Sequence, residues 1–231
     1  LLALAVLLGM TGAGVGSTGW ESMWKAHADP LSWQIVMDIR LPRTAGALLA
    51  GALLGLAGSI AQGVFRNPLA DPYLLGSASG ASLGVALAMA ALGVSPFALA
   101  GLARWGVTGA AFMGAVAAVV LTLVLAKGVH NTMRLLLAGV VVGVVLGAAA
   151  SLVLLMNPDI MQAMQSFMLG STAFVGWSAC GLMLAVWAVS MAVAWSLSRV
   201  LDGLSLGEAT AHSLGLPLAP LRMLLIVLLA L

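Results

Sequence analysis

The sequence contains very little charge. Only 7% of its 231 residues are Asp, Glu, Lys or Arg, whereas 62% are hydrophobic. So few charged residues do not provide the polar shell that a water-soluble fold of this size needs, which excludes soluble enzymes. The net charge of +2 is too small to indicate a nucleic-acid partner. The mean hydropathy of +1.15 is that of a membrane protein.

Several chemical motifs are also missing. The chain has one cysteine, Cys180, so it offers no disulfide framework and no thiolate metal site. It lacks the phosphate-binding pattern Gly-x-x-x-x-Gly-Lys-Ser/Thr, so we expect it to bind no ATP and no other cofactor, and not to be an enzyme by itself. No predicted span has an ionisable residue at its centre, where ion-coupled carriers usually hold the coupling ion. We therefore expect the energy for any transport to come from outside the membrane.

What the chain does have is a series of long hydrophobic runs. A run of about 20 residues crosses a bilayer as a helix. These runs do not alternate as membrane strands do, so we predict an all-α, polytopic transmembrane helix bundle. The predicted spans are residues 1–17 (incomplete), 44–64, 73–93, 105–126, 134–156, 174–197 and 221–231 (incomplete). We expect residues 1–231 to form one membrane domain that is truncated at both ends.

The charges between the spans favour one orientation weakly. If the first span leaves the cytoplasm, segments 65–72, 127–134 and 198–220 are cytoplasmic. Five basic residues are then inside and four outside. The inside set is Arg66, Lys127, Arg134, Arg199 and Arg222, and the outside set is Lys25, Arg40, Arg43 and Arg104.

Small residues recur every four positions in three spans. The sets are Gly51/Gly55, Gly76/Gly80/Gly84 and Gly139/Gly143/Gly147. Each set lies on one helix face, where the missing side chain lets another backbone approach. Packing is the simpler interpretation, and a substrate-lining role is the alternative.

Two loops are stiffened by proline. In Arg66-Asn67-Pro68-Leu69-Ala70-Asp71-Pro72, Asp71 and Pro72 fit the N-cap and first position of the third span. The loop is either a plain turn or a constriction with Asn67 and Leu69 pointing into a pore. Asn157-Pro158-Asp159 precedes Met161, Met164, Phe167 and Met168, whose spacing predicts a short external helix with the methionines on its packing face.

Residues 204–216 read as a small helical segment too short to cross a bilayer. Ser205 and Glu208 have the spacing of a capping box, and Gly215 and Pro217 supply stop signals. A lipid-binding segment would carry a basic face, which is absent here, so we favour a protein partner. On the predicted outer side, Arg40 and Arg43 flank Pro42. They either anchor a helix end at the headgroups or bind carboxylates of an external protein.

Together these motifs resemble the membrane permease subunits of type II ABC importers, the FecCD-like group that serves iron-siderophores, heme and vitamin B12. The resemblance runs from about residue 31 to the end. It is carried by Arg40-Leu41-Pro42-Arg43, by the 66–72 loop with Leu74-Leu75-Gly76 and Ser79-Gly80-Ala81, by residues 204–215, and less strongly by Arg134-Leu135-Leu136-Leu137-Ala138-Gly139.

The resemblance implies specific residue roles. Arg40 and Arg43 match a pair that salt-bridges glutamates of the substrate-binding protein. Asn67 with Leu69, and Thr132 with Met133, match cytoplasmic gates, although family members often have a small polar residue where Met133 stands. A third set matches the coupling helices that contact the ATP-hydrolysing subunit. It consists of Ser205, Leu206, Gly207, Glu208, Ala209, His212, Leu214 and Gly215.

The resemblance also implies the type II importer permease fold, with ten spans in the intact family, and an assembly. The partners would be an ATP-binding subunit that holds ATP and Mg²⁺, a periplasmic or lipoprotein carrier, a second permease copy and membrane lipid. The family's later motif, an apolar stretch ending in Pro-His and a basic residue, is absent. We expect import of an iron-siderophore or heme across the bacterial inner membrane. Cobalamin import is the alternative, and a secondary carrier, a channel, or a membrane scaffold or sensor are rivals of other classes.

Overall fold

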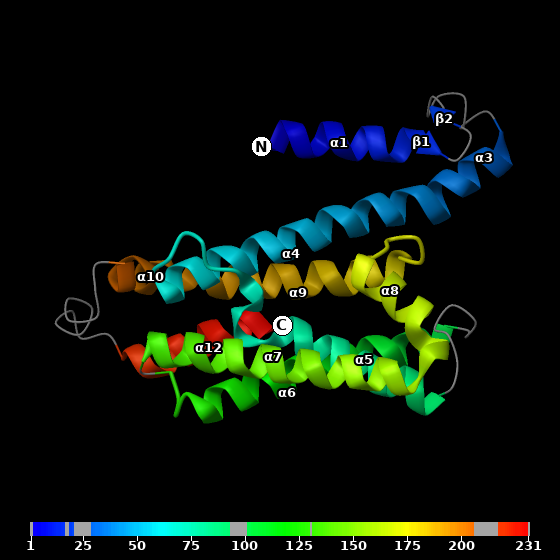
Figure 1. Cartoon of the computed structure of the whole chain (residues 1–231). Coiled ribbons are helices and arrows are strands. Elements are labelled where there is room, and N and C mark those ends of the chain that lie inside the picture. Colours follow the sequence, from blue (N-terminus) through cyan, green and yellow to red (C-terminus); the bar gives the residue numbers. More distant parts are fainter. Residues whose placement is uncertain are drawn as a thin grey trace. The chain divides into compact units, whose positions relative to one another are not determined.

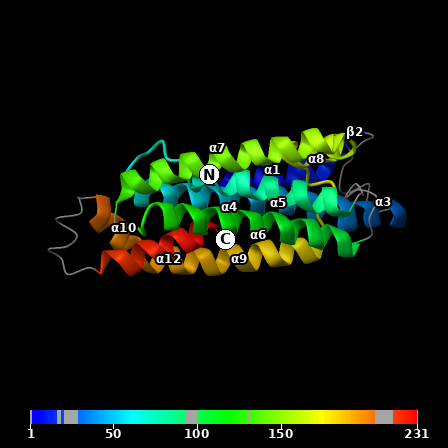
Figure 2. The ribbon, with the colours of Figure 1, turned by 60° about the horizontal axis from the view of Figure 1, so that its bottom comes forward.

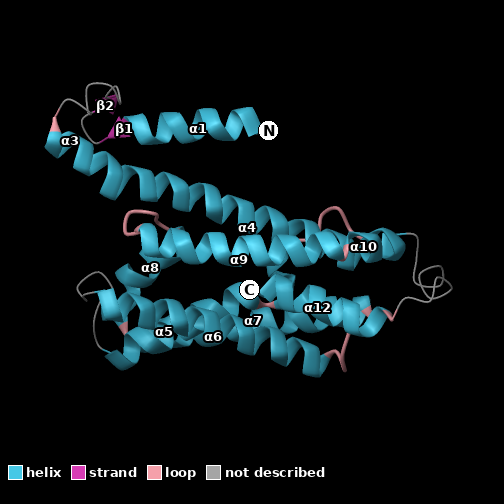
Figure 3. Cartoon of the chain, turned by 180° about the vertical axis from the view of Figure 1, so that it is seen from behind, coloured by secondary structure: helices cyan, strands magenta, loops and turns pink. Residues whose placement is uncertain are grey.

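The computed structural model describes residues 2–16, 19–20, 29–92, 101–129, 131–205 and 217–230, and these are helical over most of their length (Figures 1 and 3). The α-helices are α1 (Leu2–Gly14), α3 (Pro30–Ile35), α4 (Leu41–Phe65), α5 (Ser77–Leu92), α6 (Gly101–Leu125), α7 (Thr132–Met156), α8 (Met161–Leu169), α9 (Trp177–Ser196), α10 (Ser198–Ser205) and α12 (Leu218–Ala230). A π-helical turn η1 (Val36–Arg40) joins α3 to α4, and η2 (Pro72–Leu75) and η3 (Pro158–Ile160) are 3₁₀ turns. Strands β1 (Val15–Gly16) and β2 (Gly19–Trp20) pair antiparallel.

The all-α prediction is confirmed, with this two-residue strand pair as the one addition among the described residues. Each predicted hydrophobic run corresponds to a helix. Four helices in the described part are long and apolar enough to cross a membrane: Pro30–Phe65, Trp105–Leu125, Thr132–Met156 and Trp177–Ser196. The other three runs form shorter apolar helices, at Ala3–Gly12, Ser77–Leu92 and Leu218–Ala230.

The chain divides into two compact units. The first contains residues 1–56 and 171–195, and the second contains residues 57–170 and 196–231. In the second unit α5 packs against α6 and α7, and α6 also contacts α7 and α12; the four helices run roughly parallel (Figure 2). This bundle carries the turns in which the sequence predicts gates.

The second predicted span begins earlier than expected. The helix starts at Pro30 rather than near residue 44, because the Asp29 carboxylate accepts hydrogen bonds from the N–H groups of Leu31 and Ser32. The predicted limits followed the hydrophobic run, which begins only after the charged residue Arg43. The structure accommodates Pro42 with the π-helical turn Val36–Arg40.

The third predicted span is interrupted. Asp71 is an N-cap, as predicted, and its carboxylate accepts a hydrogen bond from the Tyr73 N–H at 2.7 Å. The helix that follows is only the 3₁₀ turn Pro72–Leu75, however, because Gly76 has a φ of +79°. This left-handed conformation favours glycine, so the chain turns there and α5 begins at Ser77.

Glycine packing is confirmed for two of the three predicted sets. A Cβ on Gly139 would collide with the Leu74 carbonyl oxygen, and one on Gly80 would collide with the Gly114 carbonyl oxygen. Helix α5 therefore approaches α6 backbone to backbone, as η2 approaches α7. Gly51 and Gly55 have nothing within 4 Å, so the described structure gives this pair no packing role.

The short helix predicted after residue 157 is α8. Met164 is buried and Phe167 packs against the same apolar cluster of α5, α6 and η3, as predicted. The prediction is wrong for Met161 and Met168, which are exposed.

Candidate functional site

The basic pair lies where the π-helical turn meets α4, in the first unit. Arg40 is the last residue of the turn and is half-buried, and Arg43 lies three residues further on and is exposed. The Nη1 atom of Arg40 is buried, so the two side chains differ in how far they reach the surface. The Arg43 Nε donates a hydrogen bond to the Ala173 carbonyl at 2.9 Å. Arg43 therefore also ties the loop before α9 to α4.

A tryptophan compensates for the proline in this helix. The Leu41 N–H bonds to the Val36 carbonyl, and Pro42 has no N–H, so neither residue donates to the Met37 carbonyl. The Trp177 indole Nε1 supplies the missing donor at 3.0 Å. The buried Cys180 Sγ donates to the Pro42 carbonyl at 3.2 Å. The start of α9 thus fixes the turn that presents Arg40.

In the second unit, two helices end with the same motif. Arg66 and Lys127 follow α4 and α6 and have φ values of 51° and 57°. After α4, the Asn67 N–H bonds to the Gln62 carbonyl at 3.1 Å and the Arg66 N–H to the Gly63 carbonyl at 3.3 Å. This pattern is a Schellman motif, and a basic residue beside a helix C-terminus is favoured by the helix dipole.

The same pair of bonds closes α6. The Gly128 N–H bonds to the Leu123 carbonyl at 2.9 Å and the Lys127 N–H to the Val124 carbonyl at 3.1 Å. We call residues 66–71 the first turn, and residues 126–129 with 131 the second turn.

The first turn holds Leu69 away from the protein. Asn67 folds back on its own loop, since its Oδ1 accepts the Leu69 N–H at 2.9 Å and its carbonyl accepts the Ala70 N–H at 3.0 Å. Leu69 is 87% exposed, whereas Ala70 next to it is buried. Of the two residues predicted here, Leu69 projects outward and Asn67 braces the turn.

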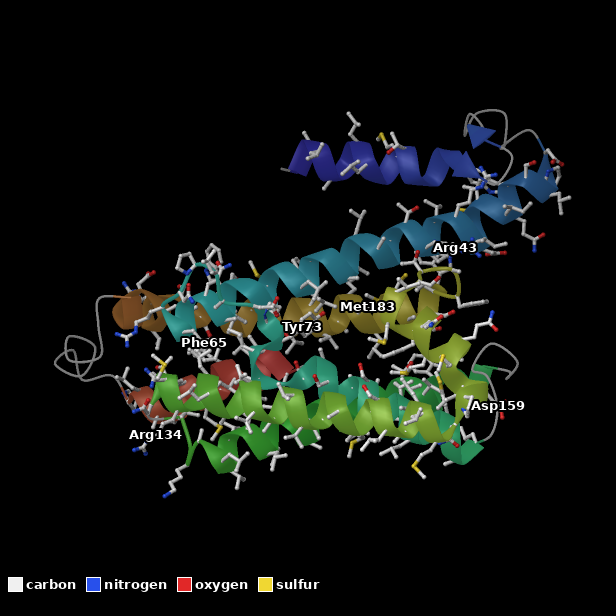
Figure 4. All side chains as sticks on the ribbon, viewed as in Figure 1. Arg43, Phe65, Tyr73, Arg134, Asp159 and Met183 are labelled. Atoms are coloured by element: carbon white, nitrogen blue, oxygen red, sulfur yellow. The ribbon has the colours of Figure 1, made fainter. Side chains whose placement is uncertain are left out.

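The second turn leads directly into α7. Asn131 is the N-cap and accepts the Arg134 N–H at 3.0 Å, which makes Thr132 and Met133 the first two residues of the helix. Met133 is 65% exposed. The Thr132 Oγ1 is buried and has no hydrogen-bond partner among the described residues. Arg134 and Asp159 mark the two ends of α7, and Phe65, beside the first turn, lies at the Arg134 end (Figure 4).

The two turns rest on one apolar core. It contains Phe65 and Ala70 from around the first turn, Ala126 and Val129 from the second, and Ile226 from α12. Two buried side chains add hydrogen bonds to it. The Thr122 hydroxyl of α6 donates to the Leu75 carbonyl at 2.9 Å, and the Arg222 Nη1 of α12 donates to the Val129 carbonyl at 2.8 Å.

Neither bond was anticipated from the sequence. Arg222 was counted as a cytoplasmic charge at the entry to the last span, and it lies inside α12 and is buried. The signal available in the sequence was a single arginine with apolar residues on both sides along the helix, which marks a residue with a specific partner.

The predicted coupling segment lies mostly outside the described residues. Ser205 is the last residue of α10, a helix that the sequence analysis did not predict. Ser205 was predicted to cap the helix that follows, and that helix lies beyond Ser205, the last residue described before residue 217. Leu206, Gly207, Glu208, Ala209, His212, Leu214 and Gly215 belong to the part that the structure does not describe.

Comparisons with known proteins agree with one another. The model of the FecCD transport family matches residues 1–231. The chain is 36% identical to the hemin transport system permease protein HmuU of Yersinia pestis, over 98% of this chain and 69% of that protein. It is 42% identical to the ferric enterobactin transport system permease protein FepD of Escherichia coli K12, over 78% of this chain and 53% of that protein.

A vitamin B12 import system permease protein, BtuC of Salmonella paratyphi A, is 38% identical over 88% of this chain and 62% of that protein. Among solved structures, an inward-facing metal-chelate type ABC transporter matches with a TM-score of 0.84 and 27% identity, over 99% of this chain and 70% of that one. The chain thus spans between about half and seven tenths of the length of these proteins. With a family model that matches along its whole length, the chain belongs to the FecCD transport family.

Proposed function

We propose that the chain is the permease subunit of an ATP-driven ABC importer that moves a large metal chelate from the periplasm to the cytoplasm. The observation that carries the proposal is the match of nearly the whole chain to the fold of a metal-chelate type ABC transporter. The relatives are named as permeases for hemin, ferric enterobactin and vitamin B12. Two of these three substrates are iron chelates, so an iron-siderophore or heme is our first candidate and cobalamin our second.

In this proposal the chain spans the bacterial inner membrane, binds no cofactor and does not hydrolyse ATP. A partner subunit binds ATP and Mg²⁺ and receives the segment Ser205–Gly215. A periplasmic or lipoprotein carrier binds at Arg40 and Arg43, and a second copy of the permease completes the pathway. ATP binding then shifts the assembly between two states, in which the pathway opens to one side at a time.

The proposed gates are supported by the geometry of the two turns. Leu69 is an exposed apolar side chain of the first turn, and Met133 is an exposed apolar side chain at the start of α7, directly after the second turn. A Schellman motif fixes the chain at the beginning of each turn. A turn fixed in this way holds its projecting side chain in one place, as a gate against a large solute requires. Asn67 and Thr132 would then shape the two turns rather than line the pathway.

The test is uptake by proteoliposomes that contain the full-length protein with its ATP-binding subunit and carrier. We expect ATP-dependent, vanadate-sensitive uptake of a ferric siderophore or hemin, with cyanocobalamin as the comparison substrate. Uptake that continues without ATP would contradict the importer assignment. Preference for cyanocobalamin would leave that assignment intact and make cobalamin, rather than an iron chelate, the first candidate substrate.

The docking role is tested separately with the double variant Arg40→Glu, Arg43→Glu. We expect it to abolish binding of the carrier, measured by surface plasmon resonance, because carboxylates on both partners repel each other. The ATP-binding subunit should still co-purify. Undiminished affinity for the carrier would rule the docking role out.

A further inference from the structure

Among the residues that the structure describes, Arg222 is the charged residue that is buried. Its exposed fraction is 2%. It is the fifth residue of α12, an apolar helix that continues through Leu224, Leu225 and Ile226. A guanidinium group inside a membrane protein is disfavoured unless it has hydrogen-bond partners. Its presence therefore points to a specific role.

The partner of Arg222 lies in the second turn. The Arg222 Nη1 donates to the Val129 carbonyl at 2.8 Å, and Val129 is itself buried. Val129 follows the Schellman motif that ends α6 and precedes the Asn131 cap that begins α7. Its carbonyl thus belongs to neither helix. The bond therefore holds Val129, and Thr132 and Met133 of the proposed second gate follow three and four residues later in the sequence.

A second contact joins α12 to the same region. Ile226 lies one helical turn after Arg222 and is buried in the core shared by Phe65, Ala70, Ala126 and Val129. Apolar contacts allow neighbouring helices to slide, whereas a charge-assisted hydrogen bond in a medium of low dielectric constant is short and directional. Arg222 therefore adds a directional connection to an otherwise apolar interface.

We propose that Arg222 is a positioning residue that transmits displacement of α12 to the second turn and so to Met133. Pro217, at the start of α12, directly follows the predicted coupling segment along the chain. A movement that the ATP-binding subunit imposes on that segment would reach the gate through the bond from Arg222 to the Val129 carbonyl. This inference rests on the proposed function.

The test uses the complete importer in nanodiscs, with a fluorophore on Met133→Cys in a Cys180→Ser background. Serine keeps a hydroxyl donor for the Pro42 carbonyl. In the otherwise unchanged protein, we expect ATP to alter the fluorescence of the label. In Arg222→Gln, we expect this response to be lost and substrate uptake per ATP hydrolysed to fall about tenfold, a typical allosteric coupling. ATP hydrolysis should stay within about twofold, because this chain holds no nucleotide site.

Two further variants sharpen the test. Arg222→Lys keeps the charge and a donor but not the planar fork, so we expect it to restore part of the response. Lys127→Gln removes a positive charge from the same turn, where Lys127 is exposed, and should leave the response and the coupling unchanged. If Arg222→Gln does not assemble, Arg222→Lys provides the comparison.

Three results would overturn the inference. A normal response of the label with normal uptake per ATP in Arg222→Gln would remove any transmitting role. A loss of uptake that only follows the amount of folded complex would make Arg222 a purely structural residue. Absence of any ATP response in the labelled protein that keeps Arg222 would overturn the gate role of Met133 itself. That outcome would count against the proposed function, whereas a defect confined to the Arg222 variants concerns only the transmission through Arg222.

Discussion

The segment around Pro42 and the region beside α7 both contain a backbone carbonyl without a donor in its own helix, but the two regions differ in burial. In both regions an irregular helix leaves a backbone carbonyl that another element must satisfy. Near Pro42 the donor is the indole of Trp177, which is 53% exposed. Beside α7 the donors are Thr122 and Arg222, which are 0% and 2% exposed.

This difference in burial determines what each bond does. Water can replace an exposed donor, so losing the Trp177 bond should change the local geometry more than the stability. A buried carbonyl has no such substitute, so the bond from Thr122 holds η2 in place and the bond from Arg222 holds the second turn.

The backbone contact between η2 and α7 should be the most sensitive feature of the gate region. Gly139→Ala places a Cβ against the Leu74 carbonyl oxygen, a backbone atom that cannot rotate away. We expect a loss of about 3 kcal/mol in stability, the upper end of the range for overpacking. Thermal unfolding in detergent measures it. Gly55→Ala is the matched control because Gly55 has nothing within 4 Å, and equal losses in both variants would refute the distinction.

Removing a buried donor should have the next largest effect. Thr122→Val keeps the shape of the side chain but deprives the Leu75 carbonyl of its hydrogen bond. We expect a loss of about 1 kcal/mol, within the range measured for side-chain hydrogen bonds in membrane proteins. Thr122→Ser retains the hydroxyl and should lose less. A Val variant as stable as the parent would mean that η2 does not depend on this bond.

The corresponding change in the first unit should be smaller. Trp177→Phe removes the donor to the Met37 carbonyl but keeps an aromatic ring. We expect a stability change below about 1 kcal/mol, since this bond is exposed whereas that of Thr122 is buried. Faster hydrogen exchange at Val36–Arg40 and weaker carrier binding should accompany it. A loss as large as that of Thr122→Val would show that burial does not separate the two regions.

The smallest expected effect concerns pH. Hydrogen bonds from the Ser32 side chain, the Ser32 N–H and the Leu31 N–H hold the pKa of the exposed Asp29 carboxyl below its usual value of 3.8. The charged form is the one that caps the helix, so its contribution is complete above pH 3.8 and is lost as the pH falls through the lowered pKa. Carboxyl titration by NMR should give a midpoint below 3.8 for Asp29. A midpoint at or above the usual value would contradict this cap.

The hydrophobic runs predicted the helices because a backbone in lipid must satisfy its own hydrogen bonds. The Asp71 cap and the packing of Gly80 and Gly139 also depend on local chemistry or helical spacing and were found from the sequence. The helix through Pro42 could not be predicted, because the donor that compensates for it is Trp177, far along the chain.

The candidate site shows the same limit. Its residues were located by their motifs, but the functions of individual side chains depend on contacts between distant segments. Asn67 turned out to brace its own turn, and Arg222 to be buried against the Val129 carbonyl 93 residues away in sequence. Such pairings are properties of the folded chain, which no periodicity reveals.

The central claim is that this permease is driven by an ATP-hydrolysing partner through the segment after Ser205. Photo-cross-linking from Glu208 and Ala211 in the assembled membrane complex tests it most directly. We expect cross-links to the ATP-binding subunit whose yield changes when ATP is added. Cross-links to lipid alone, with or without ATP, would contradict it.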